Sequence, residues 1–285
     1  MRLRARAAGR LRSPDPPALW PCRQARCYRA QRAWHGRRRL PRRGQGDPGQ
    51  SASLILALGA FTSALAGESA QFDAIGYSED GRYFAFEQFG IQDGSGFAYA
   101  EIFLIDLTTD SFVGGAPFET RIDTELVPVA AARAQAHADA ESALTEYGIS
   151  RPAVPLALRG DGELADDGLS IAYGIPSYGL AEIDGEYTLN LDIFKAPSSQ
   201  DCELFEGSPM GVAVTLQTGG ITEEIYRDTR VPASRHCVIT YKFYGIFSPF
   251  NSWDNSSSVA VLSVWSHGFE GPDRRFIALP VGDVE

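Results

Sequence analysis

The fold is decided by residues 77–89, YSEDGRYFAFEQF. Asp80 and Gly81 are expected at the centre of a turn, because Asp and Gly tolerate the backbone angles that tight turns require. The aromatic residues that follow the turn are typical of a β-strand. The Gly-rich loop 93–96 then leads to a second apolar run at 100–107. The segment therefore predicts two antiparallel strands joined as a β-hairpin.

Similar strand pairs recur near the end of the chain and, more faintly, in its middle. The strands expected there are 169–174, 187–194, 211–217, 221–227, 238–244, 258–265 and 275–281. The pairs indicate repetition, and their order is similar to the repeats of TolB-like and WD40-like β-propellers, in which each pair is half a blade. About eight or nine strands cannot close a ring of six or seven four-stranded blades. The expected fold class is mainly β: a small or incomplete β-propeller-like domain, or a β-sandwich, with one inserted α-helix.

The inserted helix is expected at 124–147, where the composition turns to Ala, Glu, Gln and Arg. Asp123 or Thr124 would be its N-cap, and Gly148 would end it. Pro128 falls in the first turn, where proline is tolerated. The apolar face is weak, so we expect an exposed helix packed on one side of the sheet. It either covers a sheet edge or binds a partner.

The first fifty residues differ in charge from the rest of the chain. They hold 14 Arg and two Asp, which gives a net charge of +12. Because the whole chain has a net charge of −10, residues 51–285 carry −22. Proline interrupts this stretch and no apolar period is present, so residues 1–50 are expected to be a disordered leader. One alternative is a nucleic-acid-binding arm, since Arg clusters neutralise phosphates. We favour a leader, either an extended one or one produced by a start codon assigned too early.

Residues 51–66 have the features of a secretory signal peptide. The apolar run 54–66 spans 13 residues, whereas a membrane-spanning helix needs about 20. Ala64-Leu65-Ala66 supplies the small-x-small pattern at which such signals are cleaved. We therefore expect cleavage after Ala66, no membrane span after cleavage, and a single secreted or periplasmic β-rich domain at 67–285.

Cleavage would leave Cys202 and Cys237 as the only cysteines. In an oxidising compartment these two have a single pairing, and a loop of this length gains about 4 kcal/mol at most from closure. A structural disulfide is therefore expected, with two unpaired core cysteines as the alternative. Two cysteines without a CxxC motif are too few for a Cys-based zinc site or dithiol redox chemistry.

Three histidines limit the catalytic chemistry of the expected domain. His137 lies in the expected helix without a second His four residues away, so it should be solvated. His236 precedes Cys237, which raises the hypothesis of a nucleophilic Cys–His pair. Neighbouring side chains on a strand point to opposite faces, however, so these two would lie apart. His267 lies in the loop of the last strand pair and is retained as a candidate ligand-binding residue. The chain has no G-x-S-x-G elbow, no G-x-G-x-x-G that opens a helix, and no P-loop.

One loop crowds four carboxylates together, from Asp161, Glu163, Asp166 and Asp167. Carboxylate oxygens are the ligands that Ca²⁺ prefers, and an exported protein meets that ion. The spacing does not match an EF-hand, and solvated turn acids are the alternative. No other cofactor is expected.

The densest aromatic segment is 241–253. Its first part predicts a strand, and beyond Gly245 and Pro249 the chain must turn. Phe250 and Trp253 fall in that turn, where aromatic rings can stack on sugars or peptides. These two residues are candidate ligand contacts, although core rings of an all-β fold are the alternative.

Two motifs resemble a family of bacterial predicted secreted proteins of unknown function. They are 81–87 with 92–96 near the start of the expected domain, and 269–275 near its end. The resemblance covers most of 67–285 and implies export, without a known activity, ligand or catalytic residue. We therefore expect an exported non-catalytic binding or structural module whose partner is an envelope protein, a peptide or a saccharide. No nucleic acid is expected, because a charge of −22 repels phosphates. The alternative is a cell-envelope hydrolase that uses the loop carboxylates and His267.

Overall fold

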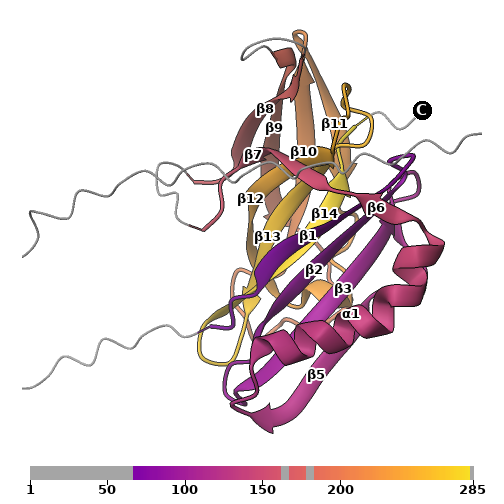
Figure 1. The fold of residues 1–285 in the computed structure, drawn as a ribbon. Helices are drawn as coiled ribbons and strands as arrows, with labels where there is room; N and C mark the ends of the chain where they lie inside the picture. Colours follow the sequence, from indigo (N-terminus) through magenta and orange to yellow (C-terminus); the bar gives the residue numbers. More distant parts are fainter. Residues whose placement is uncertain (1–66, 162–166, 178–182, 283–285) are drawn as a thin grey trace, which may run out of the picture. The chain divides into compact units, whose positions relative to one another are not determined.

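The computed structural model describes residues 67–161, 167–177 and 183–282. The expected Arg-rich leader, the expected signal peptide and its predicted cleavage after Ala66 fall outside these residues, as do Glu163 and Asp166 of the calcium hypothesis. Within the described part of the chain, three antiparallel sheets hold the strands, and one α-helix lies on the first sheet (Figure 1). No helix in these ranges is both long and apolar enough to cross a membrane.

The first sheet contains the hairpin that the sequence predicts. Its strands are β1 Gln71–Ser78, β2 Tyr83–Ile91, β3 Phe97–Asp106, β4 Ser111–Phe112, β5 Phe118–Glu125 and β6 Ile149–Arg151. They run in the order β4-β3-β2-β1-β6, and β5 pairs with β3. In the turn between β1 and β2, Gly81 has φ +75° and its N–H donates to the Ser78 carbonyl over 3.0 Å. Glycine adopts this left-handed backbone without a steric cost, which places the turn at Gly81.

Two further sheets contain four strands each. The second has β7 Ala153–Leu158, β12 Val238–Pro249, β13 Val259–His267 and β14 Pro272–Pro280, in the order β14-β13-β12-β7. The third has β8 Ser170–Pro176, β9 Ile183–Lys195, β10 Met210–Thr218 and β11 Ile221–Arg227, in the order β11-β10-β9-β8. A short 3₁₀ helix, η1 Ala233–Arg235, precedes β12.

The second sheet is the middle layer of a stack, because its two faces enter different cores. Along β13, Val259 and Val261 pack with the first sheet, whereas Ala260, Leu262 and Val264 pack with the third. A strand buried on both faces needs apolar side chains at successive positions instead of alternate ones. This explains why the stretch 258–265 has no polar alternation.

The β-sandwich alternative describes this architecture, and the described strands form no propeller ring. The strand pairs that suggested repeats are hairpins, such as β2–β3 and β13–β14, whose strands pair residue by residue. These hairpins belong to sheets that stack face to face, held by two hydrophobic cores. Local hairpin patterns are common to both architectures, so the resemblance to propeller repeats does not extend to the whole fold.

The helix α1 spans Val129–Glu146 and begins later than the sequence predicts. Asp123 and Thr124, the expected N-caps, lie in β5, and Pro128 takes the N-cap position. Pairing with β3 therefore outweighs the helix propensity of residues 124 and 125. The end is close to the prediction: Tyr147 is the C-cap, and Gly148 follows with φ +65°.

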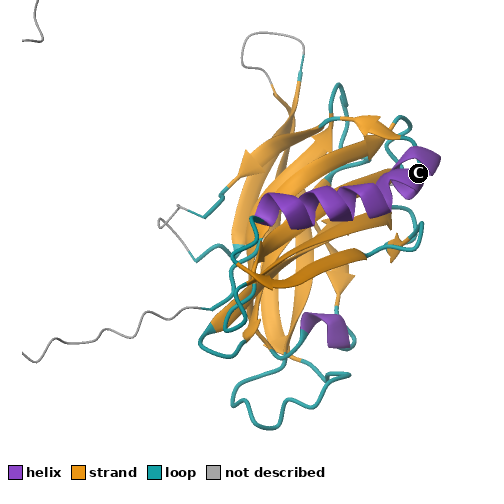
Figure 2. Ribbon diagram, turned by 60° about the horizontal axis from the view of Figure 1, so that its bottom comes forward, coloured by secondary structure: helices purple, strands orange, loops and turns teal. Residues whose placement is uncertain are grey.

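The helix covers a face of the first sheet and not its edge, as Figures 1 and 2 show. Its buried stripe consists of small residues, Ala132, Ala136, Ala140 and Ala143. They pack on Ala98, Ala100 and Ile102 of β3 and on neighbouring apolar side chains. Small residues on both elements allow a close approach, so the expectation of a helix packed on one side of the sheet is confirmed.

Polar side chains connect the first and middle sheets inside the stack. The Phe276 N–H of β14 donates to Gln88 Oε1 of β2 over 2.8 Å, and the Tyr77 hydroxyl of β1 donates to the Phe247 carbonyl of β12 over 3.0 Å. Both bonds are buried, so they help to fix the position of one sheet on the other.

Candidate functional site

A disulfide bond joins Cys202 and Cys237, as the sequence predicts, with an S–S distance of 2.06 Å. It attaches the loop 196–209, which connects β9 and β10, to the start of β12. Because the Cys237 sulfur is bonded, it cannot serve as a nucleophile beside His236. The bond also fixes the loop next to the end of β13, where the His267 N–H donates to the Cys237 carbonyl over 3.0 Å.

Four loops meet at this end of the sheets, which we call the loop end. It consists of the β2–β3, β5–α1, β9–β10 and β13–β14 connections together with the strand ends beside them, residues 91–96, 125–128, 196–209 and 267–273. In Figure 1 these connections lie towards the lower end of the view.

Direct contacts connect the four loops. Glu125 pairs with Phe97, at the end of the loop 91–96. A Cβ added at Gly94 would lie 3.8 Å from the ring of Phe269. The His267 ring stacks on Phe205, with the ring centroids 4.5 Å apart and the planes 13° apart. The contacts therefore connect the loops in series, from residue 125 to the disulfide loop.

The largest apolar exposures of the described residues lie at the loop end. Leu126 is 95% exposed, Leu204 94% and Phe269 87%, each on a different loop. Ile91 and Phe205 of the same surface are exposed to a lesser degree. Single exposed apolar side chains are ordinary, whereas a group of them at one place marks an interaction surface.

Leu126 is held in an unfavourable backbone conformation. Its φ is +63°, in the left-handed region that a bulky residue seldom adopts. Such strain persists where the surrounding structure enforces it, and it is concentrated at functional sites. Here the strained residue exposes its side chain to water, so the fold gains no burial that would compensate for the strain.

Acidic side chains surround the exposed apolar ones. Glu203 and Glu206 flank Leu204 and Phe205, Glu125 precedes Leu126, and Glu270 follows Phe269. All four carboxylates are exposed. Beside them, residues 196–203 with Ser208 and Pro209 line a shallow hollow of about 470 Å³, to which Asp201 and Glu203 contribute. The four loops contain no Lys or Arg.

The structure does not bring the three predicted ligand contacts together. His267 belongs to the loop end. Phe250 and Trp253 lie in the turn at the opposite end of β13, about 27 Å away for a strand of this length. They are 53% and 47% exposed, so neither is a core ring. The backbone of Phe250 is bonded to Pro152 and Arg151, which anchors the turn.

His137 is not simply solvated, because its Nε2 lies 3.2 Å from the Glu87 carboxylate. Glu87 is wholly buried beneath α1 and also accepts two bonds from Arg133, at 2.7 and 3.0 Å. The Arg133 guanidinium in turn stacks over the Phe89 ring, 4.0 Å from its centroid. Glu87 was not among the candidate residues, although a carboxylate inside the aromatic strand 83–89 is the signal that could have found it.

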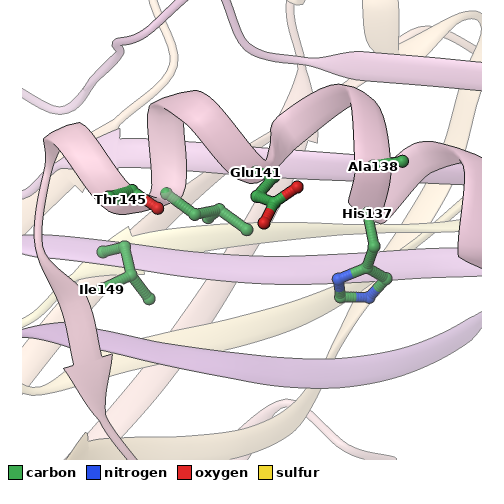
Figure 3. A pocket seen from close by; sticks show the side chains of 6 residues that line it. His137, Ala138, Glu141, Thr145 and Ile149 are labelled. Carbon is green, nitrogen blue, oxygen red and sulfur yellow. The ribbon is translucent and has the colours of Figure 1, made fainter.

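A second shallow hollow, of about 370 Å³, lies along α1. His137 and Glu141 border it on one side of the helix, with Thr145 and Ile149 at its far end (Figure 3). The buried carboxylate that contacts His137 is already paired with Arg133. These contacts hold the helix on the sheet.

The calcium hypothesis stays a prediction, because two of its four carboxylates lie outside the described residues. Of the other two, Asp161 is ion-paired with Arg274 and Asp167 accepts a bond from the Leu169 N–H at 2.9 Å. The described ranges contain no group of three His, Cys, Asp or Glu side chains arranged to hold a metal ion. The hydrolase alternative gains no support from these residues, because Asp161 is ion-paired with Arg274 and the His267 ring stacks on Phe205.

A buried charged cluster lies between the first and middle sheets. Arg275 is ion-paired with Glu68 and lies over the Tyr99 ring, 4.8 Å from its centroid, while Gln88 donates to Glu101. Burial raises the pKa of Glu101 above its ordinary value, against the lowering effect of the Gln88 bond. The cluster therefore couples the stability of the fold to pH.

Comparison with known proteins identifies one relationship. No protein of the curated set matches the chain. A family model described as "Predicted secreted protein (DUF2259)" matches residues 85–282, which is more than half of the chain and includes the second and third sheets and most of the first. The chain therefore belongs to this family of predicted secreted proteins.

Proposed function

We propose that this protein is an exported, non-catalytic binding module and that the loop end is its binding surface. The observation on which the proposal rests is the exposure of Leu126, Leu204 and Phe269, on three loops that are connected in series through the loop 91–96. Burial of such a side chain contributes about 1.5–3 kcal/mol relative to exposure. A partner that covered all three would gain enough to offset a substantial part of the cost of association.

The scaffold supports this role because it holds the loops before a partner arrives. The disulfide fixes the loop 196–209, and the stack of His267 on Phe205 joins it to the β13–β14 connection. Loops that are already ordered lose little conformational entropy on binding. Binding residues on loops above a rigid β-scaffold are a common arrangement.

Capture experiments with two matched variants test the proposal. The loop-end variant carries Leu126→Gly, Leu204→Ser and Phe269→Ser. The control carries Ile221→Ser, Phe250→Ser and Trp253→Ser, three exposed apolar residues outside the loop end.

The exported form of each protein is immobilised and exposed to envelope extract, and retained molecules are compared by mass spectrometry. We expect the wild type and the control to retain the same partner and the loop-end variant to lose it. Loss in the control alone would move the binding surface to the turn of Phe250 and Trp253. Equal retention by all three proteins would refute the proposal.

A further inference from the structure

We infer that the partner is a cationic, apolar polypeptide segment, in which Lys or Arg residues alternate with large apolar ones; this inference rests on the loop end being the binding surface. It follows from the charges and spacing of the described side chains. Each exposed apolar residue has a carboxylate neighbour: Glu125 beside Leu126, Glu203 beside Leu204, and Glu270 beside Phe269. A ligand that covers the apolar side chains must therefore also approach negative charge.

A carboxylate oxygen without a partner strengthens the argument for a cation. Asp93 Oδ2 is buried and has no hydrogen-bond partner among the described residues. Asp93 belongs to the loop 91–96, and a Cβ added at the next residue, Gly94, would lie 3.8 Å from the ring of Phe269. A buried acceptor that lacks a partner is unfavourable, so an adjustment of the loop 91–96 that let a ligand's Lys or Arg donate to it would favour binding.

The hollow beside the disulfide provides room for such a side chain. Its volume of about 470 Å³ lies within the range of ligand-binding clefts. Asp201 and Glu203 contribute to its lining, and the Asp201 side chain accepts a bond from the Glu203 N–H at 3.0 Å. Leu204, next in the chain, would then contact the apolar residue that adjoins the cation.

Other occupants fit these charges less well. An anionic membrane surface would be repelled by the exposed carboxylates, and a second copy of the chain would oppose acid with acid. A neutral saccharide could stack on Phe269 but would gain nothing from the carboxylates. A cationic segment alone satisfies both the apolar and the acidic parts of the surface.

Synthetic peptides of 14 residues test the inference, with binding to the exported form of the protein measured by fluorescence anisotropy. The probe alternates Lys and Leu. One comparison peptide replaces every Lys by Glu, and another replaces every Leu by Ser. We expect the Lys/Leu peptide to bind at least tenfold more tightly than either, and its affinity to fall several-fold as salt rises from low to high ionic strength.

Protein variants assign the binding to the loop end. Asp201→Asn with Glu203→Gln should weaken binding of the Lys/Leu peptide at least fivefold, and Asp93→Asn should weaken it as well. The control, Glu186→Gln with Glu223→Gln, makes the same change in net charge at exposed sites on the third sheet. It should leave the affinity unchanged. Equal weakening by the control would show non-specific attraction and overturn the inference.

The outcomes also separate this inference from the proposed function. One contrary result is that the peptide with Glu in place of Lys, a neutral oligosaccharide or anionic vesicles bind tightly to the wild type and not to the loop-end variant. That result would keep the loop end as the binding surface and overturn the inference that the partner is cationic. If the Lys/Leu peptide binds the loop-end variant as well as the wild type, the binding surface itself is wrong.

Discussion

Replacing Leu126 by Gly should stabilise the fold while it removes a binding side chain. Leu126 has φ +63°, a conformation that costs a residue other than glycine roughly 1–2 kcal/mol. Its side chain is 95% exposed, so truncation forfeits almost no burial. Glycine gives up about 0.5–1 kcal/mol of chain entropy on folding. The net expectation is a gain of about 0.5–1 kcal/mol.

Urea unfolding, followed by circular dichroism with the disulfide intact, measures this gain. The midpoint should rise by roughly 0.2–0.4 M without a change in the slope m. Leu204→Gly is the matched control: Leu204 is 94% exposed but is not among the described residues with positive φ. That variant should lose stability through chain entropy alone. A Leu126→Gly midpoint below that of the wild type would show that Leu126 is packed or unstrained and would refute the reasoning.

Three other perturbations test the scaffold. Cys202→Ser with Cys237→Ser should lower the free energy of unfolding by about 3–4 kcal/mol in urea titrations, and an unchanged midpoint would contradict a disulfide in solution. Burial raises the pKa of Glu101, so its contribution to stability is present at acidic pH and is lost as pH rises through the folded pKa. Glu101→Gln should therefore flatten the decline of Tm as pH rises past the ordinary pKa of a glutamate in calorimetric scans, whereas parallel profiles would exclude this carboxyl as the cause. Arg133→Met leaves the buried Glu87 without its main cation and should cost about 3–5 kcal/mol; a loss below 1 kcal/mol would contradict the pairing.

The features that the sequence predicts correctly depend on local chemistry. The Asp80-Gly81 turn follows from two residues whose backbone preferences need no distant partner. The disulfide follows from the single pairing open to Cys202 and Cys237. The helix is recognised by its composition, but its start is misplaced because pairing of β5 with β3 depends on residues about 20 positions away.

The layered stack is harder to infer, because a hairpin has the same local pattern in any β-architecture. The apolar stretch 258–265 is the one sequence signal of a central sheet buried on both faces. From the sequence this stretch predicts only a strand, since periodicity does not say how many layers cover it.

The candidate site was only partly predictable. His267, a candidate ligand contact from the sequence, lies at the loop end, and its role stays a prediction, whereas Leu126, Leu204 and Phe269 lie in separate turns. Only the fold places these turns together. A signal was nevertheless present, since each of these bulky apolar residues stands next to a Glu in a turn, where it serves neither a strand nor a solvated loop.

The most direct test of the binding surface is amide hydrogen exchange of the protein, followed by mass spectrometry, with and without the Lys/Leu peptide. The proposal predicts slower exchange in the loops 91–96, 125–128, 196–209 and 267–273, and unchanged exchange in α1 and in the turn 250–257. Protection confined to that turn or to α1 would contradict it.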